Sequence, residues 1–158
     1  RVYRKIHLFD ARLKTVSLKE SKIFLAGKSP VMGKVDEFKV GMSVCYDLRF
    51  PGLYQYYRRA GAHIVTVPSC FTRTTGRAHW EVLLRARAIE NQCYVLAPNQ
   101  IGKDARGIAA YGRSMVVSPW GEILARGSAN KEEMIFAGIS LREIKKSQKI
   151  LPGFCKIS

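Results

Sequence analysis

The sequence contains no apolar run approaching the roughly 20 residues that a membrane-spanning helix needs. Its first residues, 1–5, also lack the apolar core of a secretory signal. The four cysteines (Cys45, Cys70, Cys93 and Cys155) are widely separated, and none has the CxxC or Cys–His spacing of a zinc site. These absences predict free thiols in a reducing compartment, no bound metal and no membrane partner. We expect a cytoplasmic protein, or a mitochondrial isoform of one.

Acidic residues are scarce, with 12 Asp and Glu against 27 Lys and Arg, which gives a formal net charge of +15. Such a charge is common in proteins that bind nucleic acid or anionic membranes. The basic residues are scattered along the chain, however, and no recognition helix, RNP motif or zinc finger accompanies them. A solvated basic surface is therefore the favoured interpretation, and we expect no nucleic-acid partner.

Repeats, low-complexity tracts and flexible linkers are absent, so residues 1–158 are interpreted as a single domain. Strand-like and helix-like patterns alternate along the chain, which is typical of an α/β layered fold. The predicted strands are 2–9, 38–46, 62–70, 93–99, a hairpin in 112–126 that turns at 118–121, and 133–141. The predicted helices are 51–60, 79–92 and a basic helix after 141, and 10–36 is predicted to be a long loop.

Cys45 lies where the apolar run 38–46 ends, a few residues before the helix predicted from Pro51. In α/β layers, ligands bind at the carboxyl ends of strands, so this position favours a functional thiol. A thiol becomes a useful nucleophile when a cation stabilises its thiolate, and Lys5 is a candidate for that cation. A buried structural thiol is the commoner role for such a residue. The polar neighbourhood CYDLRFP, in which Asp47 is placed to pair or to cap the helix, sets this cysteine apart.

Four segments carry a resemblance to a known family: YRKIHLFD, GMSVCYDLRFP, FTRTTGRAHWEVLLRARAIENQCYV and YGRSMVVSPWGEILA. In order and spacing, from Tyr3 to about Leu141, they resemble the nitrilase superfamily of carbon-nitrogen hydrolases, and within it the branch of deaminated glutathione amidase and omega-amidase. The resemblance implies an αββα sandwich that forms a homodimer or a higher homo-oligomer. It also implies hydrolysis of a small linear ω-amide, such as deaminated glutathione, through a cysteine thioester and without a cofactor.

The resemblance also assigns roles to individual residues. Lys5 occupies the lysine of the family's YRK-x-HLF motif, and Cys45 occupies the nucleophile of its CYD-x-RFP motif. The backbone N–H of Tyr46 would then join the Lys5 ammonium in an oxyanion hole. Glu20, in LKES, matches a second glutamate that helps to position the lysine and the substrate.

The chain departs from the family where the family carries its general base. That glutamate lies N-terminal to the lysine strand, and only residues 1–4 precede Lys5 here. We therefore expect a truncated member that lacks its first strands and helices and is catalytically impaired. A non-catalytic interaction or scaffold protein of nitrilase-like fold is the alternative function. Gly52, where relatives carry a glutamate, is interpreted as a tolerated surface change.

The stretch 69–76 follows a predicted strand and is a candidate substrate loop. We expect Phe71 to wall the amide pocket, and Thr72, Arg73 and Thr75 to contact a carboxylate of the substrate. An ordinary polar loop is the competing interpretation.

Histidine offers a second catalytic arrangement, in which His79 acts as base for Cys45 and Asn91 or Asn99 orients it. A capping and packing role at a helix start is favoured for His79 instead. The acidic residues of the same predicted helix, Glu81 and Glu90, are expected to pair with its arginines, and a contact of Glu81 with the catalytic lysine is the alternative.

Overall fold

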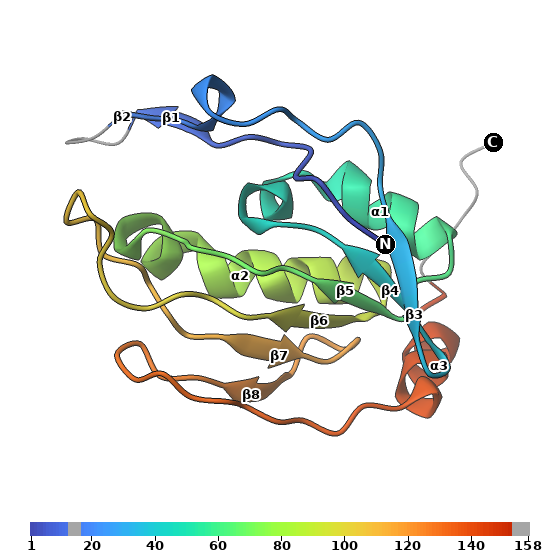
Figure 1. Ribbon diagram of the computed structural model, residues 1–158. Coiled ribbons are helices and arrows are strands. Elements are labelled where there is room, and N and C mark those ends of the chain that lie inside the picture. The colour runs from blue at the N-terminus through green and yellow to red at the C-terminus, as the bar shows by residue number, and fades with distance from the viewer. Residues whose placement is uncertain (13–16, 153–158) are drawn as a thin grey trace.

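A six-stranded sheet forms the centre of the computed structural model, which describes residues 1–12 and 17–152 (Figure 1). The strand order follows the chain: β3 (Met32–Val35), β4 (Phe38–Met42), β5 (Ile64–Thr66), β6 (Tyr94–Ala97), β7 (Met115–Val117) and β8 (Ile123–Arg126). The three central strands, β4, β5 and β6, run parallel, and the pairs outside them are antiparallel. The β7–β8 pair is the hairpin predicted from the sequence, closed by the Gly121 N–H, which donates to the Ser118 carbonyl at 2.9 Å.

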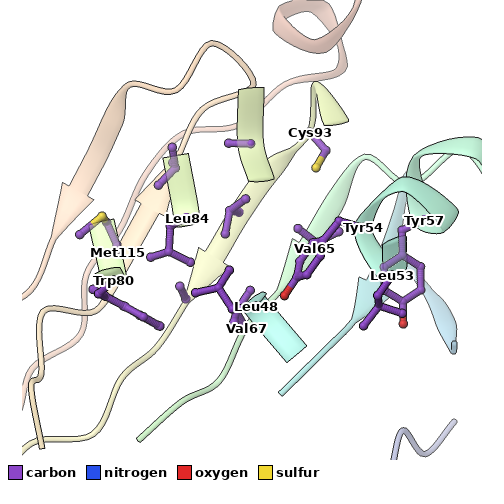
Figure 2. Close-up of a cluster of buried hydrophobic side chains, with 14 of the residues drawn as sticks. Leu48, Leu53, Tyr54, Tyr57, Val65, Val67, Trp80, Leu84, Cys93 and Met115 are labelled. Carbon is purple, nitrogen blue, oxygen red and sulfur yellow. The ribbon is translucent and has the colours of Figure 1, made fainter. Parts of the chain in front are cut away.

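Two helices connect the parallel strands, α1 (Pro51–Arg59) and α2 (Arg73–Asn91). Pro51 begins α1, where its fixed φ suits a helix and its missing N–H costs nothing. The chain leaves α1 at Gly61, whose φ of 80° is one that glycine adopts without strain. Both helices pack on one face of the sheet and share a core with it, whose largest side chains include those of Tyr54, Trp80 and Leu84 (Figure 2).

The two faces of the sheet bury different clusters because neighbouring strand residues point in opposite directions. Val65 and Val95 belong to the core under α1 and α2. Ile64 and Tyr94, one position earlier in each strand, belong to a second cluster on the other face, where Ile144 of α3 (Leu141–Ile150) covers them. The mixed α/β fold predicted from the sequence is therefore confirmed, with one main helical layer on one six-stranded sheet in the described residues.

A small second sheet lies apart from the main one, formed by β1 (Asp10–Arg12) and β2 (Ser17–Lys19) (Figure 1). The short 3₁₀ helix η1 (Glu20–Lys22) follows directly and carries one residue of the site described below. None of the helices in the described part of the chain is long and apolar enough to cross a membrane.

Several predicted boundaries are wrong near the N-terminus. Residues 2–9 form no strand. Their backbone is held instead by single contacts, such as the Gly27 N–H, which donates to the Lys5 carbonyl at 2.8 Å. The predicted loop 10–36 contains β1, β2, η1 and β3, and the strand predicted over 38–46 ends at Met42.

Two further predictions are wrong later in the chain. The strand predicted over 133–141 is irregular, and Met134 and Phe136 are 81% and 79% exposed because no neighbouring strand covers them. The helix predicted to begin at His79 begins at Arg73. The Thr72 hydroxyl caps this earlier start by accepting a hydrogen bond from the Thr75 N–H at 3.3 Å.

Candidate active site

Cys45 begins a second 3₁₀ helix, η2 (Cys45–Arg49), rather than ending a strand. Its φ of 49° is a left-handed conformation, which costs a non-glycine residue about 1–3 kcal/mol and persists only when the surroundings impose it. One such restraint is the Cys45 N–H, which donates to the Pro68 carbonyl at 2.9 Å in the segment after β5. The turn therefore presents the thiol beside the ends of β4 and β5, the edge that sequence reasoning favoured.

The buried carboxylate of Asp47 ties the N-terminal segment to this turn. It accepts a hydrogen bond from the Tyr3 hydroxyl at 2.8 Å, one from the His7 N–H at 2.9 Å, and a third contact with the His7 ring at 2.8 Å. Oδ2, the oxygen that accepts from Tyr3, also caps η2 by accepting a hydrogen bond from the backbone N–H of Val44 at 2.9 Å. Tyr3 and His7 flank Lys5, so this one carboxylate fixes the segment that carries the lysine against the segment that carries the cysteine.

Lys5 forms an ion pair with Glu20, with the ammonium nitrogen 2.6 Å from Oε2. The side chain of Lys5 is 14% exposed, so the pair lies where solvent screens it only weakly. The same Glu20 oxygen accepts a hydrogen bond from the Phe9 N–H at 2.7 Å, which fixes the carboxylate on its other side. Glu20 therefore holds the ammonium between two fixed contacts, and its supporting role in catalysis stays a prediction.

Lys5, Glu20 and Cys45 line a single cavity of about 940 Å³. Its apolar wall comes mainly from the N-terminal third of the chain, from Leu8, Phe9, Leu18, Ile23, Phe24 and Leu25. The opposite wall contains Cys70 and Thr72 from the segment after β5, and Asp104 and Arg106 form an ion pair at its edge. The Tyr46 N–H makes no hydrogen bond within the described ranges, so a donor is left free next to the thiol.

Burial raises the pKa of the Cys45 thiol, and this is the largest influence on it. The Cys70 backbone N–H, the Lys5 ammonium and the Ser69 hydroxyl lower the pKa by stabilising the thiolate, whereas the Glu20 carboxylate raises it. Because burial outweighs the three favourable groups, the resting group is a neutral thiol. The nucleophile therefore has to lose its proton when it attacks.

Four residues were predicted to line the substrate site, and they lie in different places. Thr75 lies in the first turn of α2, where its N–H donates to the Thr72 hydroxyl. Thr72 is at the cavity wall. Phe71 is not: its buried ring packs on Trp80, with 4.8 Å between the ring centroids, and belongs to the core. Arg73 lines a separate, neighbouring cavity. The sequence placed all four in one loop, but Thr72 is the cap of α2 and Arg73 its first residue, so their side chains diverge.

The histidine-based arrangement is not assembled. His79 is exposed on α2, its ring nitrogen lies 3.3 Å from the Arg49 guanidinium, and it is not part of the wall of the Cys45 cavity. Asn91 and Asn99 are buried and donate to the backbone carbonyls of Arg87 and Gly112. The predicted pairing within the helix is confirmed, because Glu90 pairs with Arg87 at 3.0 Å and Glu81 pairs more loosely with Arg85 at 4.0 Å. The closer partner of Glu81 is Arg126 on β8, at 2.6 Å, and the contact of Glu81 with Lys5 is wrong.

Other features of the site could not be found from sequence patterns. Cys70, Asp104 and Arg106 reach the cavity from loops whose course depends on the whole sheet. Within the described ranges, no three His, Cys, Asp or Glu side chains converge in a way that could hold a metal ion.

The fold and the site together define a class of protein: an α/β domain that holds a cysteine, a lysine and a glutamate in one cavity. The sequence matches the family model described as carbon-nitrogen hydrolase over residues 1–149. The chain belongs to this family.

Named relatives agree with that assignment. The chain is 44% identical over 154 residues to deaminated glutathione amidase from Dictyostelium discoideum, covering 96% of this chain and 53% of that protein. It is 45% identical over 156 residues to the deaminated glutathione amidase of Bos taurus, covering 96% and 47%. The crystal structure of the C. elegans NitFhit protein superposes with a TM-score of 0.88 at 44% identity, covering 95% of this chain and 37% of that one. The chain thus spans about half the length of the curated relatives it matches.

Proposed function

We propose that the protein hydrolyses the C–N bond of a small linear ω-amide of the deaminated glutathione type, with Cys45 as nucleophile. The observation that carries this proposal is the convergence of Cys45, Lys5 and Glu20 on one cavity, with the ammonium held 2.6 Å from the carboxylate. The apolar wall of the cavity suits the methylene chain of such a substrate. The relatives named deaminated glutathione amidase favour this substrate class.

The first half of the reaction forms a thioester. The Cys45 sulfur attacks the amide carbon as its proton passes to a carboxylate, and the carbonyl oxygen becomes an oxyanion. The free Tyr46 N–H and the Lys5 ammonium stabilise that oxyanion. The carboxylic acid then protonates the amide nitrogen and the C–N bond breaks. The amine leaves, as ammonia from a primary ω-amide or as cysteinylglycine from deaminated glutathione, and the acyl group stays on the Cys45 sulfur.

The second half restores the thiol. Water gives a proton to the carboxylate and attacks the thioester carbon, and the carboxylic acid product leaves as the thiol regains its proton. The resemblance gives both proton transfers to a glutamate N-terminal to Lys5, which is not among residues 1–4. Glu20 keeps the separate role of positioning Lys5, since its Oε2 is already engaged by the ammonium and by the Phe9 N–H.

Trapping the thioester tests the proposal. The protein is purified in a form that includes the general-base glutamate N-terminal to Lys5, quenched in acid during turnover of an ω-amide, digested and examined by mass spectrometry. We expect an adduct on the Cys45 peptide whose mass equals that of the substrate less the released amine, which is ammonia for a primary ω-amide and cysteinylglycine for deaminated glutathione. The adduct should be absent in Cys45→Ala. The Cys70→Ala variant serves as the matched control and retains the adduct. An adduct on Cys70 or Cys93 in the wild type, or turnover by Cys45→Ala, contradicts the proposal.

A further inference from the structure

A second cavity, of about 530 Å³, adjoins the cavity of Cys45. We call it the basic pocket, because Arg73, Arg77, Lys103 and Arg113 line it and no acidic residue does. The two cavities share the wall formed by the backbone of 109–110. They are therefore neighbours, separated by one short segment of chain.

The four cations of the basic pocket have no carboxylate partners in the described part of the chain. Four arginines elsewhere in the protein, Arg85, Arg87, Arg106 and Arg126, each form an ion pair with an acidic side chain. Gathering like charges without counter-charges is unfavourable, because they repel one another. A bound anion would relieve that repulsion.

The start of α2 adds to the positive potential. Arg73 is the first residue of this 19-residue helix, Arg77 follows one turn later, and the first turn contains no acidic residue. The N-terminus of a helix carries a partial positive charge, so cations there are destabilising and anions are favoured. Arg73 and Arg77 therefore destabilise this end of α2 in the free protein, and an anionic ligand would stabilise it.

The other wall of the basic pocket is fixed. The backbone of Arg113 has a φ of 58°, its N–H donates to Ser128 at 3.0 Å, and its carbonyl accepts from the indole of Trp80 at 2.8 Å. Tyr111 packs so closely on Gly76 that a Cβ there would lie 2.3 Å from the ring. The Arg113 guanidinium also lies over the Tyr111 ring, 5.8 Å from its centroid. This wall is therefore formed before any ligand binds.

We propose that the basic pocket binds the carboxylate at the far end of an extended substrate whose amide lies at Cys45. The inference rests on the proposed function and specifies which ω-amides are preferred, namely those with a second, distant carboxylate. Thr72 lines the cavity of Cys45 and Arg73, the next residue, lines the basic pocket, so a substrate that follows this wall passes from one to the other. In deaminated glutathione two residues, Cys and Gly, separate the scissile amide from the C-terminal carboxylate, a reach of roughly 7 Å when extended. Guanidinium groups match a carboxylate by forming two parallel hydrogen bonds.

The test compares three amides: deaminated glutathione, the same compound with its C-terminal carboxylate esterified, and the short α-ketoglutaramate. The variant is the double substitution Arg73→Gln and Arg77→Gln. Its control is Arg142→Gln, which removes one charge from the exposed face of α3, at the other end of the molecule from the start of α2 (Figure 1). We expect the KM for deaminated glutathione to rise about tenfold or more in the double variant. The KM for the ester and for α-ketoglutaramate should change less than about twofold.

A binding measurement supplies a readout that does not need turnover. Titration calorimetry of deaminated glutathione into Cys45→Ala should give an affinity that weakens with added salt, and the two further arginine substitutions should remove most of that salt dependence. Equal effects on all three amides, or none, would overturn the inference. The inference would also be overturned if inorganic phosphate bound at Arg73 and Arg77 without competing with deaminated glutathione. Failure of the wild type to hydrolyse any of the three amides would instead count against the proposed function.

Discussion

The ammonium of Lys5 and the carboxylate of Glu20 lie 2.6 Å apart, although fifteen positions separate them along the chain. The contact joins the irregular N-terminal segment to η1 and leaves the ammonium at the cavity wall next to Cys45. The chemistry proposed for Cys45 therefore depends on a contact between two segments that belong to no strand of the main sheet.

Replacing Glu20 with glutamine should have two opposite effects. Loss of the ion pair frees the Lys5 ammonium to move, so kcat for the ω-amide should fall about 10²-fold with little change in KM. Loss of the negative charge should lower the pKa of Cys45, because the Glu20 carboxylate raises it, so iodoacetamide should alkylate the Cys45 peptide faster at pH 8. The exposed Glu37→Gln is the control and should change neither rate. Slower alkylation in the Glu20 variant would contradict the assigned electrostatics.

Replacing Asp47 with asparagine should cost about 2–4 kcal/mol of unfolding free energy, measured by urea denaturation. The side-chain NH₂ would face donors that the carboxylate now accepts from, including the Tyr3 hydroxyl and the backbone of His7. Tyr3→Phe removes a single hydrogen bond and should cost only about 1 kcal/mol. If Asp47→Asn lowers the unfolding free energy no more than Tyr3→Phe does, Asp47 does not hold the segment that carries Lys5 against the segment that carries Cys45.

Two glycine substitutions should change stability in opposite directions. At Gly41, an added Cβ would lie 2.6 Å from the ring of Tyr57, which cannot retreat because it is fully buried and its hydroxyl accepts from the Val31 N–H at 3.2 Å. Gly41→Ala should therefore destabilise the protein by about 1–3 kcal/mol. Gly52, in the first turn of α1, has nothing within 4 Å of such a Cβ, and Gly52→Ala should stabilise by roughly 0.5–1 kcal/mol. Thermal melts of the two variants measure both changes in stability. If Gly52→Ala destabilised the protein, the open space described around Gly52 in α1 would be wrong.

Alkaline pH should weaken the fold in part through Cys93. Burial raises the pKa of this thiol from 9.0 to about 12. The unfolded chain thus loses this proton first, so the contribution of the buried thiol is complete below pH 9 and is lost as the pH rises towards about 12. In Cys93→Ala, the unfolding free energy should fall less steeply between pH 9 and 11 than in the wild type. Identical slopes would mean that the thiol does not titrate with unfolding.

The sequence predicted well what depends on local pattern. Pro51 and Gly61 marked the two ends of α1, and the turn from Ser118 to Gly121 marked the β7–β8 hairpin. The motifs that contain Lys5 and Cys45 led to the cavity that both residues line. In each case the informative residues are neighbours in the chain or carry a family pattern.

The sequence failed where tertiary contacts decide the structure. Residues 2–9 alternate like a strand, but the contacts made by Asp47 and Gly27 hold them in an irregular path. Arg73 was expected to share one loop with its neighbours, but the Thr72 cap starts α2 there and turns Arg73 into the basic pocket. No pattern in the sequence reveals either contact.

Because residues 2–9 follow an irregular path, we expect warming to release this segment before it unfolds the main sheet. Each main-chain anchor of this stretch, such as the bond from Gly27 to Lys5, stands alone and can break without disturbing β3–β8. Local opening of this arm, visible as fast amide exchange, would carry the ammonium away while the sheet and its two helices stay intact. We expect heat inactivation to precede melting, because the reactive centre depends on a few separate contacts of this segment and not on the core.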